Sequence, residues 1–174
     1  MRNFRDVGAF VNLIAGEPLL PEGRLYRCGT IQRIESPEEI ESPRTIFNLK
    51  RSPDPPVDGA EILWFPLANT SEVYETETPG VREWLSDIVR AVAEKACFPS
   101  LFHCHSGVDR TGVVIGSLLS ILGVPKEVIV EEFLLSDGAP GAGRITDALN
   151  PLAEPSRYFR RVDLDVVRTK VLGE

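Results

Sequence analysis

Residues 102–112 read FHCHSGVDRTG and hold both histidines of the 174-residue chain together with one of its three cysteines. The segment that leads into this stretch, residues 100–104, is short and apolar, which predicts a buried strand. The segment that follows, residues 111–122, is apolar on nearly every side, which predicts a buried helix that ends at Gly123 and Pro125. The stretch is therefore expected to be a loop that joins a strand to a helix.

Strands and helices alternate along the rest of the chain. Further strands are expected at residues 25–28, 45–49 and 61–65, whereas residues 66–78 and the rest of the first thirty residues are expected to be loop. A helix start with a capping box is expected at residues 36–39, and longer helices are expected from residue 79, at 126–135 and at 155–171, with residues 137–143 as a loop. The helix from residue 79 carries one apolar stripe: Val81, Trp84, Leu85, Ile88, Val89 and Val92. This alternation predicts an α/β domain with a central sheet.

Composition narrows the class of protein. The chain is long enough for one domain with its own core, which we expect to span residues 1–174. No apolar run is long enough for a membrane-spanning helix, and the first residues lack the apolar core of a signal peptide. The net charge of −7 argues against binding to nucleic acid or to an anionic membrane, and three scattered cysteines argue against a disulfide framework. A cytoplasmic enzyme is expected.

The two histidines do not form a good metal site. His103 and His105 alternate with Cys104, so on a strand the two imidazoles face opposite sides. A closed zinc site needs four ligands, commonly in two pairs, and the sequence offers no second pair. We therefore expect neither a metal nor a cofactor.

A loop between a strand end and a helix start suits an anion instead. The first turn of a helix leaves backbone N–H groups unpaired, and the helix dipole adds partial positive charge there. Cys104 and Arg110 are separated by five residues, so a loop that wraps an anion brings the thiol and the guanidinium together across it. Gly107 gives the loop room to turn, and Thr111 is placed to donate its hydroxyl to the sulfur.

This arrangement predicts nucleophilic phosphoryl transfer. We call the loop from Cys104 to Arg110 the cradle, and its amides and arginine favour the thiolate form of Cys104. The thiolate attacks phosphorus and forms a phosphocysteine, which water then hydrolyses. The amides of one run of residues are expected to bind the phosphate: His105, Ser106, Gly107, Val108, Asp109 and Arg110. A non-catalytic phosphate-binding module and a redox or sulfur-transfer enzyme remain alternatives, because cysteine cradles of this shape hold other chemistry too.

The segment HCHSGVDRTG resembles the signature HC-x5-R-[ST]-G of the protein tyrosine phosphatase superfamily. Residues 3–8 (NFRDVG), 24–29 (RLYRCG) and 48–50 (NLK) resemble segments of an atypical group of bacterial tyrosine and lipid phosphatases and fungal dual-specificity relatives. The resemblance implies a mostly parallel sheet of four or five strands flanked by helices, no metal, and catalysis by the Cys–Arg loop. It also implies a phosphorylated protein or a small phosphomonoester as substrate. The expected activity is that of a phosphotyrosine or dual-specificity protein phosphatase, with a phosphoinositide or inositol-phosphate phosphatase as the alternative.

The chain departs from the resemblance in two places. Lipid phosphatases of this group often carry a lysine where this chain has Val108, which favours a phosphoprotein substrate. The family takes the proton for the leaving group from an aspartate on an upstream loop, and the corresponding loop here contains no aspartate. Glu72 on that loop is the first candidate for the general acid and Asp109 the second. The third rank is shared by Asp54 and Asp58.

The remaining candidates are supporting residues. His103 is expected to buttress the loop or to tune the thiolate, rather than to transfer protons. Arg5, Asp6 and Arg27 are expected to tie the amino-terminal segment to the site, unless Arg27 contacts substrate. Cys28 and Cys97 are candidates for a resolving thiol that would protect Cys104 from oxidation, a role that depends on their distances from it.

Overall fold

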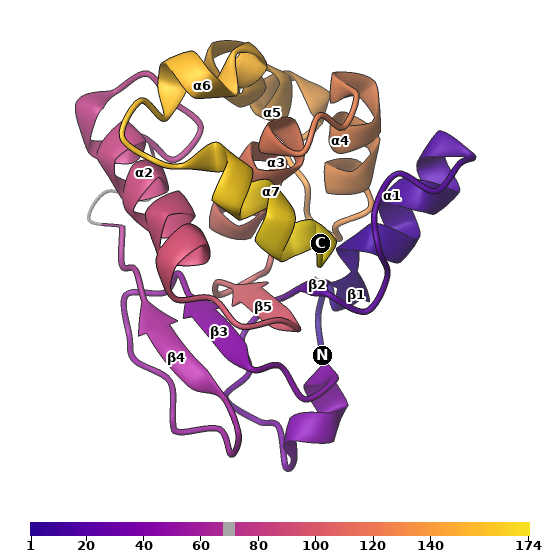
Figure 1. The fold of residues 1–174 in the computed structure, drawn as a ribbon. Helices are drawn as coiled ribbons and strands as arrows, with labels where there is room; N and C mark the ends of the chain where they lie inside the picture. The colour runs from indigo at the N-terminus through magenta and orange to yellow at the C-terminus, as the bar shows by residue number, and fades with distance from the viewer. Residues whose placement is uncertain (68–71) are drawn as a thin grey trace.

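The computed structural model describes residues 1–67 and 72–174, and within them it contains one five-stranded sheet (Figure 1). The strands are β1 (Arg5–Asp6), β2 (Leu25–Cys28), β3 (Thr45–Asn48), β4 (Glu61–Trp64) and β5 (Ser100–His103). Their order across the sheet is β1-β2-β5-β3-β4, and every pair is parallel except β1 with β2. The predicted mostly parallel α/β fold is confirmed. Residues 68–71, within the expected loop at 66–78, lie outside the described residues.

The helices follow the strands in the predicted alternation. They are α1 (Val7–Ala15), α2 (Pro79–Glu94), α3 (Asp109–Ile121), α4 (Lys126–Leu134), α5 (Ala142–Leu149), α6 (Pro155–Tyr158) and α7 (Leu164–Leu172), with 3-10 turns η1 (Pro37–Ile40) and η3 (Asn150–Ala153). In Figure 1, α2, α3 and α7 lie together over one face of the sheet. No helix among the described residues is both long and apolar enough to cross a membrane.

Side chains of the central strands alternate between two cores, as the two-residue period of a strand requires. Leu25, Phe47 and Phe102 point into the core under the helices, where the two phenylalanine rings stack with their centroids 4.2 Å apart. A smaller core on the opposite face is made by Tyr26, Cys28, Ile46 and Leu101 with Ile40 of η1. Strand β5 is therefore buried along its whole length, and its carboxyl end is fixed between β2 and β3.

The expectation of loop before residue 25 is wrong, because residues 7–15 form α1. The cause is the side chain of Asp6, which accepts hydrogen bonds from the amides of Gly8 (2.9 Å) and Ala9 (3.4 Å) and so caps the helix. The same carboxylate also accepts a hydrogen bond from the amide of Gly23. Asp6 therefore joins the helix start to the segment that leads into β2.

The prediction of one continuous helix over residues 155–171 is wrong. The segment is divided into α6 and α7, because Asp163 caps a new helix by accepting hydrogen bonds from the amides of Asp165 and Val166. Helix α5 is an addition to the expected elements, and it begins inside the glycine-rich segment that was expected to be loop.

Candidate active site

The loop between β5 and α3 has the strand–loop–helix form that the sequence predicts. His103 is the last residue of β5, Cys104 follows it with 1% of its surface exposed, and α3 begins at Asp109. Gly107 has a φ of +74°, and a Cβ on it would lie 2.5 Å from the carbonyl carbon of Cys28. Only glycine fits both the conformation and the close approach to β2. The loop is thus held in shape by the neighbouring strand.

Arg110 is oriented from the other side by β3. Its Nη1 donates a hydrogen bond of 2.8 Å to the carbonyl oxygen of Leu49, the residue directly after the strand. The amide of Leu49 in turn bonds to the carbonyl of His103. The backbone of Leu49 therefore fixes the direction of the guanidinium relative to the loop.

His103 is supported by a buried carboxylate. Its Nε2 lies 2.7 Å from Oδ2 of Asp54, and Nζ of Lys50 lies 2.6 Å from Oδ1 of the same carboxylate. Burial alone would raise the pKa of Asp54, but the hydrogen bond and charge of His103, together with those of Lys50, hold it below its usual value. The Asp54 side chain is fully buried and engaged by both partners, so it supports His103 rather than facing a leaving group.

The loop after β4 reaches the cradle through a tyrosine. The hydroxyl of Tyr74 donates a hydrogen bond of 2.8 Å to Oδ1 of Asp109. Burial and this hydrogen bond raise the pKa of Tyr74 above its usual value, so the phenol keeps its proton at neutral pH. The ring packs edge-on against Phe133, and the guanidinium carbon of Arg144 lies 5.8 Å from its centroid. Glu72 lies two residues before Tyr74 and is half-buried.

A buried ionic network lies behind the loop. Arg27, with no exposed surface, donates to Oε2 of Glu132 (2.6 Å) and to the carbonyl oxygen of Gly107 (2.9 Å). Arg5 donates to Oε1 of Glu132 (2.8 Å), and Ser136 accepts hydrogen bonds from both arginines. Burial and repulsion from Arg27 lower the pKa of Arg5, against the opposing effect of Glu132. Arg27 is therefore built into the support of the loop, and its complete burial leaves it no contact with a substrate in solution.

The other residues of the loop differ in exposure. His105 is exposed, whereas Val108 is 2% exposed and packs in the main core, so position 108 offers the cradle only its backbone. The hydroxyl of Thr111 is buried and makes no hydrogen bond within the described part of the chain, which leaves its donor uncommitted. The amino-terminal segment also touches the loop, because Asn3 Nδ2 donates to the carbonyl of Ser106 at 2.8 Å.

The two further cysteines lie in different surroundings. Cys28 is fully buried in β2 and pairs in register with His103, and burial followed by the charge of Cys104 raises the pKa of its thiol. Cys97 is exposed and precedes β5, whereas Cys104 follows it, so a four-residue strand of roughly 13 Å separates them. A disulfide needs α-carbons within about 7 Å, which excludes Cys97 as its partner in this fold. All three cysteines are free thiols.

Glu132 and Ser136 are absent from the candidates that the sequence indicates, although a signal for them exists. Glu132 lies on the buried side of α4 with Ile129 and Phe133, and Ser136 follows two residues after the helix ends and is also buried. Polar residues on the apolar stripe of a helix require buried partners. Tyr74 and Lys50 carry no comparable sequence signal, because their roles depend on partners that only the fold brings close.

Known proteins resemble this chain in part of its sequence or in its fold. The sequence model of the tyrosine phosphatase family matches residues 1–154. A tyrosine-protein phosphatase of Nostoc commune is 53% identical over 36 residues, which make up 21% of this chain and 12% of that protein. The core catalytic domain of the PP-IP phosphatase Siw14 of S. cerevisiae, solved with citrate, has a TM-score of 0.61 at 16% identity and covers 96% of this chain and 89% of its own. A second structure of the Siw14 catalytic core has a TM-score of 0.53, also at 16% identity, covering 96% and 88%.

Proposed function

The chain belongs to the tyrosine phosphatase family, and we propose that it hydrolyses phosphate monoesters through a phosphocysteine on Cys104. One observation carries the proposal. The loop from Cys104 to the first turn of α3 is held on one side by the backbone of Cys28 against Gly107, and Arg110 is oriented on the other by the carbonyl of Leu49. Such a loop presents amides, a thiol and a guanidinium to one tetrahedral anion without reorganisation.

The reaction has two steps. In the first, the Cys104 thiolate attacks phosphorus, and the bond from phosphorus to the ester oxygen breaks while Arg110 and the amides of residues 105–110 hold the equatorial oxygens. The leaving oxygen takes a proton from a carboxylic acid. In the second, water attacks the phosphocysteine and gives its proton to the carboxylate that the first step left deprotonated. The bond from phosphorus to sulfur breaks and the sulfur leaves as thiolate, with the hydroxyl of Thr111, uncommitted within the described residues, as its hydrogen-bond donor. His103, backed by Asp54, positions the start of the loop.

For the general acid we favour Asp109 over Glu72. Asp109 stands on the first turn of α3, inside the cradle, and Tyr74 fixes its Oδ1. The other oxygen, Oδ2, is then available to carry the proton to the leaving group. Glu72 remains the alternative because it lies on the same loop as Tyr74.

The substrate is a phosphotyrosine or dual-specificity phosphoprotein in this proposal, and the setting is cytoplasmic, without nucleic-acid or stable membrane partners. An inositol-phosphate phosphatase is the second candidate, favoured by the fold shared with a PP-IP phosphatase. The burial of Val108 removes one reason to prefer the first, since the side chain at that position faces the core rather than the anion.

A substrate panel tests the proposal. The wild-type protein is assayed with an aryl phosphate, phosphotyrosine and phosphoserine peptides, and inositol phosphates, beside Cys104→Ser and the neighbouring-thiol control Cys97→Ser. We expect turnover that falls at least about 1,000-fold in Cys104→Ser and is unchanged in Cys97→Ser. Higher kcat/KM for inositol phosphates than for peptides would select the second candidate, and equal turnover in the two variants would refute the cysteine mechanism.

A further inference from the structure

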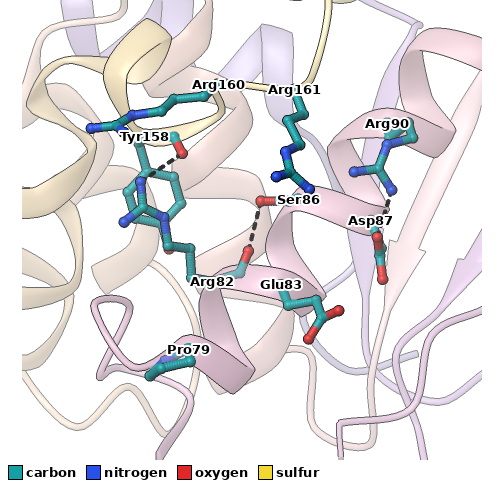
Figure 2. Close-up of a pocket in the computed structure, with 9 residues that line it drawn as sticks. All are labelled: Pro79, Arg82, Glu83, Ser86, Asp87, Arg90, Tyr158, Arg160 and Arg161. Atoms are coloured by element: carbon teal, nitrogen blue, oxygen red, sulfur yellow. Dashed lines mark hydrogen bonds and ion pairs between the residues drawn. The ribbon is translucent and has the colours of Figure 1, made fainter.

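A groove of about 680 Å³ lies between the outward side of α2 and the turn that follows α6 (Figure 2). Cys104 is not among the residues that line it. Four arginines line it, Arg82, Arg90, Arg160 and Arg161, against two acidic residues, Glu83 and Asp87. The local excess of positive charge contrasts with the net charge of −7 of the whole chain. A local basic groove on an acidic protein attracts an anionic ligand to that place alone.

Among the residues that the structure describes, most of the positive charge in the groove has no acidic partner. Arg90 is paired with Asp87 at 2.7 Å. Arg82 donates instead to the carbonyl oxygens of Arg157 and Tyr158, and its guanidinium carbon lies 4.7 Å from the centroid of the Tyr158 ring. Arg160 donates its Nε to a carbonyl at 3.1 Å. Arg161 has no hydrogen bond or ion pair with any residue that the structure describes, and its guanidinium points toward α2 in Figure 2.

The arginines form a row rather than a single clamp. Arg82, Ser86 and Arg90 follow one another at four-residue intervals on one side of α2, so the row is roughly 12 Å long at about 1.5 Å per residue. Arg161 faces the same side of the helix from the turn after α6. About four residues of an extended peptide span this length at roughly 3.3 Å each. The spacing thus fits several separate carboxylates better than one compact phosphate.

The groove is close to the cradle along the chain. The guanidinium of Arg82 lies over the ring of Tyr158, and the hydroxyl of this tyrosine donates a hydrogen bond of 2.5 Å to the carbonyl of Thr76. Tyr74, two residues earlier, donates to Asp109. Pro79 at the groove is five residues beyond Tyr74, so the two α-carbons are at most about 17 Å apart at roughly 3.4 Å per residue.

We infer that this groove docks an acidic segment of a phosphoprotein substrate, about five to ten residues from the phosphorylated residue in the cradle. This inference rests on the proposed phosphatase function and narrows its substrates to phosphoproteins with acidic residues at that spacing. Separate carboxylates of the segment pair with Arg82, Arg160 and Arg161, and the peptide lies along α2. The acidic segment contributes to binding and not to the chemical step.

Matched peptides test the docking. Phosphotyrosine peptides carry four glutamates or four glutamines, placed five to eight residues before or after the phosphotyrosine. The double variant Arg160→Glu/Arg161→Glu is compared with Arg44→Glu/Lys95→Glu, which makes the same charge change at two exposed positions at the amino-terminal end of the sheet. We expect the glutamates to lower KM about tenfold in the wild type and in the control, and to have no effect in the groove variant.

Two further readings separate this inference from the phosphatase proposal. Turnover of a small aryl phosphate should be equal in all three proteins, which shows that the groove variant is folded and its cradle intact. Binding of the unphosphorylated glutamate peptide to Cys104→Ser, followed by fluorescence anisotropy, should weaken about tenfold when the groove charges are reversed. Equal KM for the two peptides, or equal loss in both double variants, would overturn the docking site and leave the phosphatase proposal standing.

Discussion

The hydroxyl of Tyr74 and Oδ1 of Asp109 are 2.8 Å apart, and this hydrogen bond connects the loop after β4 to the first turn of α3. The tyrosine keeps its proton because burial and the carboxylate both raise its pKa. It therefore acts as a permanent donor that selects one orientation of the Asp109 carboxylate. The arrangement separates the two oxygens of Asp109, with one fixed by the phenol and the other directed away from it.

Replacing Tyr74 by phenylalanine tests this positioning. We expect kcat to fall about tenfold, since Asp109 loses its fixed orientation, and KM for an aryl phosphate to change little. In Tyr74→Phe/Asp109→Asn the kcat should equal that of Asp109→Asn alone, because the tyrosine acts only through the aspartate. Independent, multiplicative losses in the double variant would show that Tyr74 has a separate role.

The general acid can be identified from the way kcat depends on the leaving group of the substrate. A poor leaving group depends on a proton far more than a good one, so loss of the acid steepens the dependence of kcat on the pKa of the leaving alcohol. We expect this in Asp109→Asn, with losses of about 100-fold for an alkyl phosphate and much less for a nitrophenyl phosphate. Glu72→Gln serves as the matched variant. The steeper dependence in Glu72→Gln, with Asp109→Asn unaffected, would transfer the role to Glu72.

The buried network behind the loop should contribute strongly to stability. Glu132→Gln leaves Arg5 and Arg27 without their shared carboxylate, and we expect the free energy of unfolding to fall by about 3–5 kcal/mol. The exposed neighbour on the same helix gives the control, Glu131→Gln, with a change of less than about 0.5 kcal/mol. Urea unfolding measures both. Equal midpoints and slopes for the two variants would mean that the network is not formed in solution.

The Asp54 carboxylate makes stability depend on pH in a defined direction. Its pKa is lowered in the folded protein, so its contribution is complete above the value of about 3.9 of an unfolded chain. That contribution is lost as the pH falls through the lower folded value. We expect Asp54→Asn to destabilise the protein by about 3 kcal/mol at pH 7, and the difference from the wild type to shrink below about pH 4.

The control for this measurement is Asp165→Asn. Asp165 also makes an ion pair, with Arg168 at 2.6 Å, but its side chain is 91% exposed. Exposed pairs contribute little, so we expect a change of less than about 1 kcal/mol, with no comparable dependence on pH. A constant effect of Asp54→Asn between pH 3 and pH 7 would contradict the lowered pKa.

The sequence alone predicts the cradle because its determinants are local. Strand β5, the loop and α3 are consecutive, and the C-x5-R spacing places Cys104 and Arg110 at the two ends of one turn. The supports of the cradle are not local. Glu132 meets Arg27 across 105 positions, and Asp54 meets His103 across 49, so only the packing of helices and strands reveals them.

Two features of the fold were missed for related reasons. Helix α1 depends on the bonds that Asp6 makes to the amides of Gly8, Ala9 and the distant Gly23, and the last of these is invisible in a local pattern. The break between α6 and α7 depends on Asp163 acting as a cap, although an aspartate within an apolar pattern also fits a continuous helix.

Detection of the phosphocysteine on Cys104 tests the proposed mechanism directly. The wild-type protein is mixed with an aryl phosphate, quenched in acid within milliseconds, digested and analysed by mass spectrometry. We expect one phosphoryl group on the peptide that contains Cys104, on sulfur, and its absence in Cys104→Ser. Turnover without any phosphorylated cysteine under these conditions, or a phosphoryl group on a different residue of the wild-type protein, would contradict it.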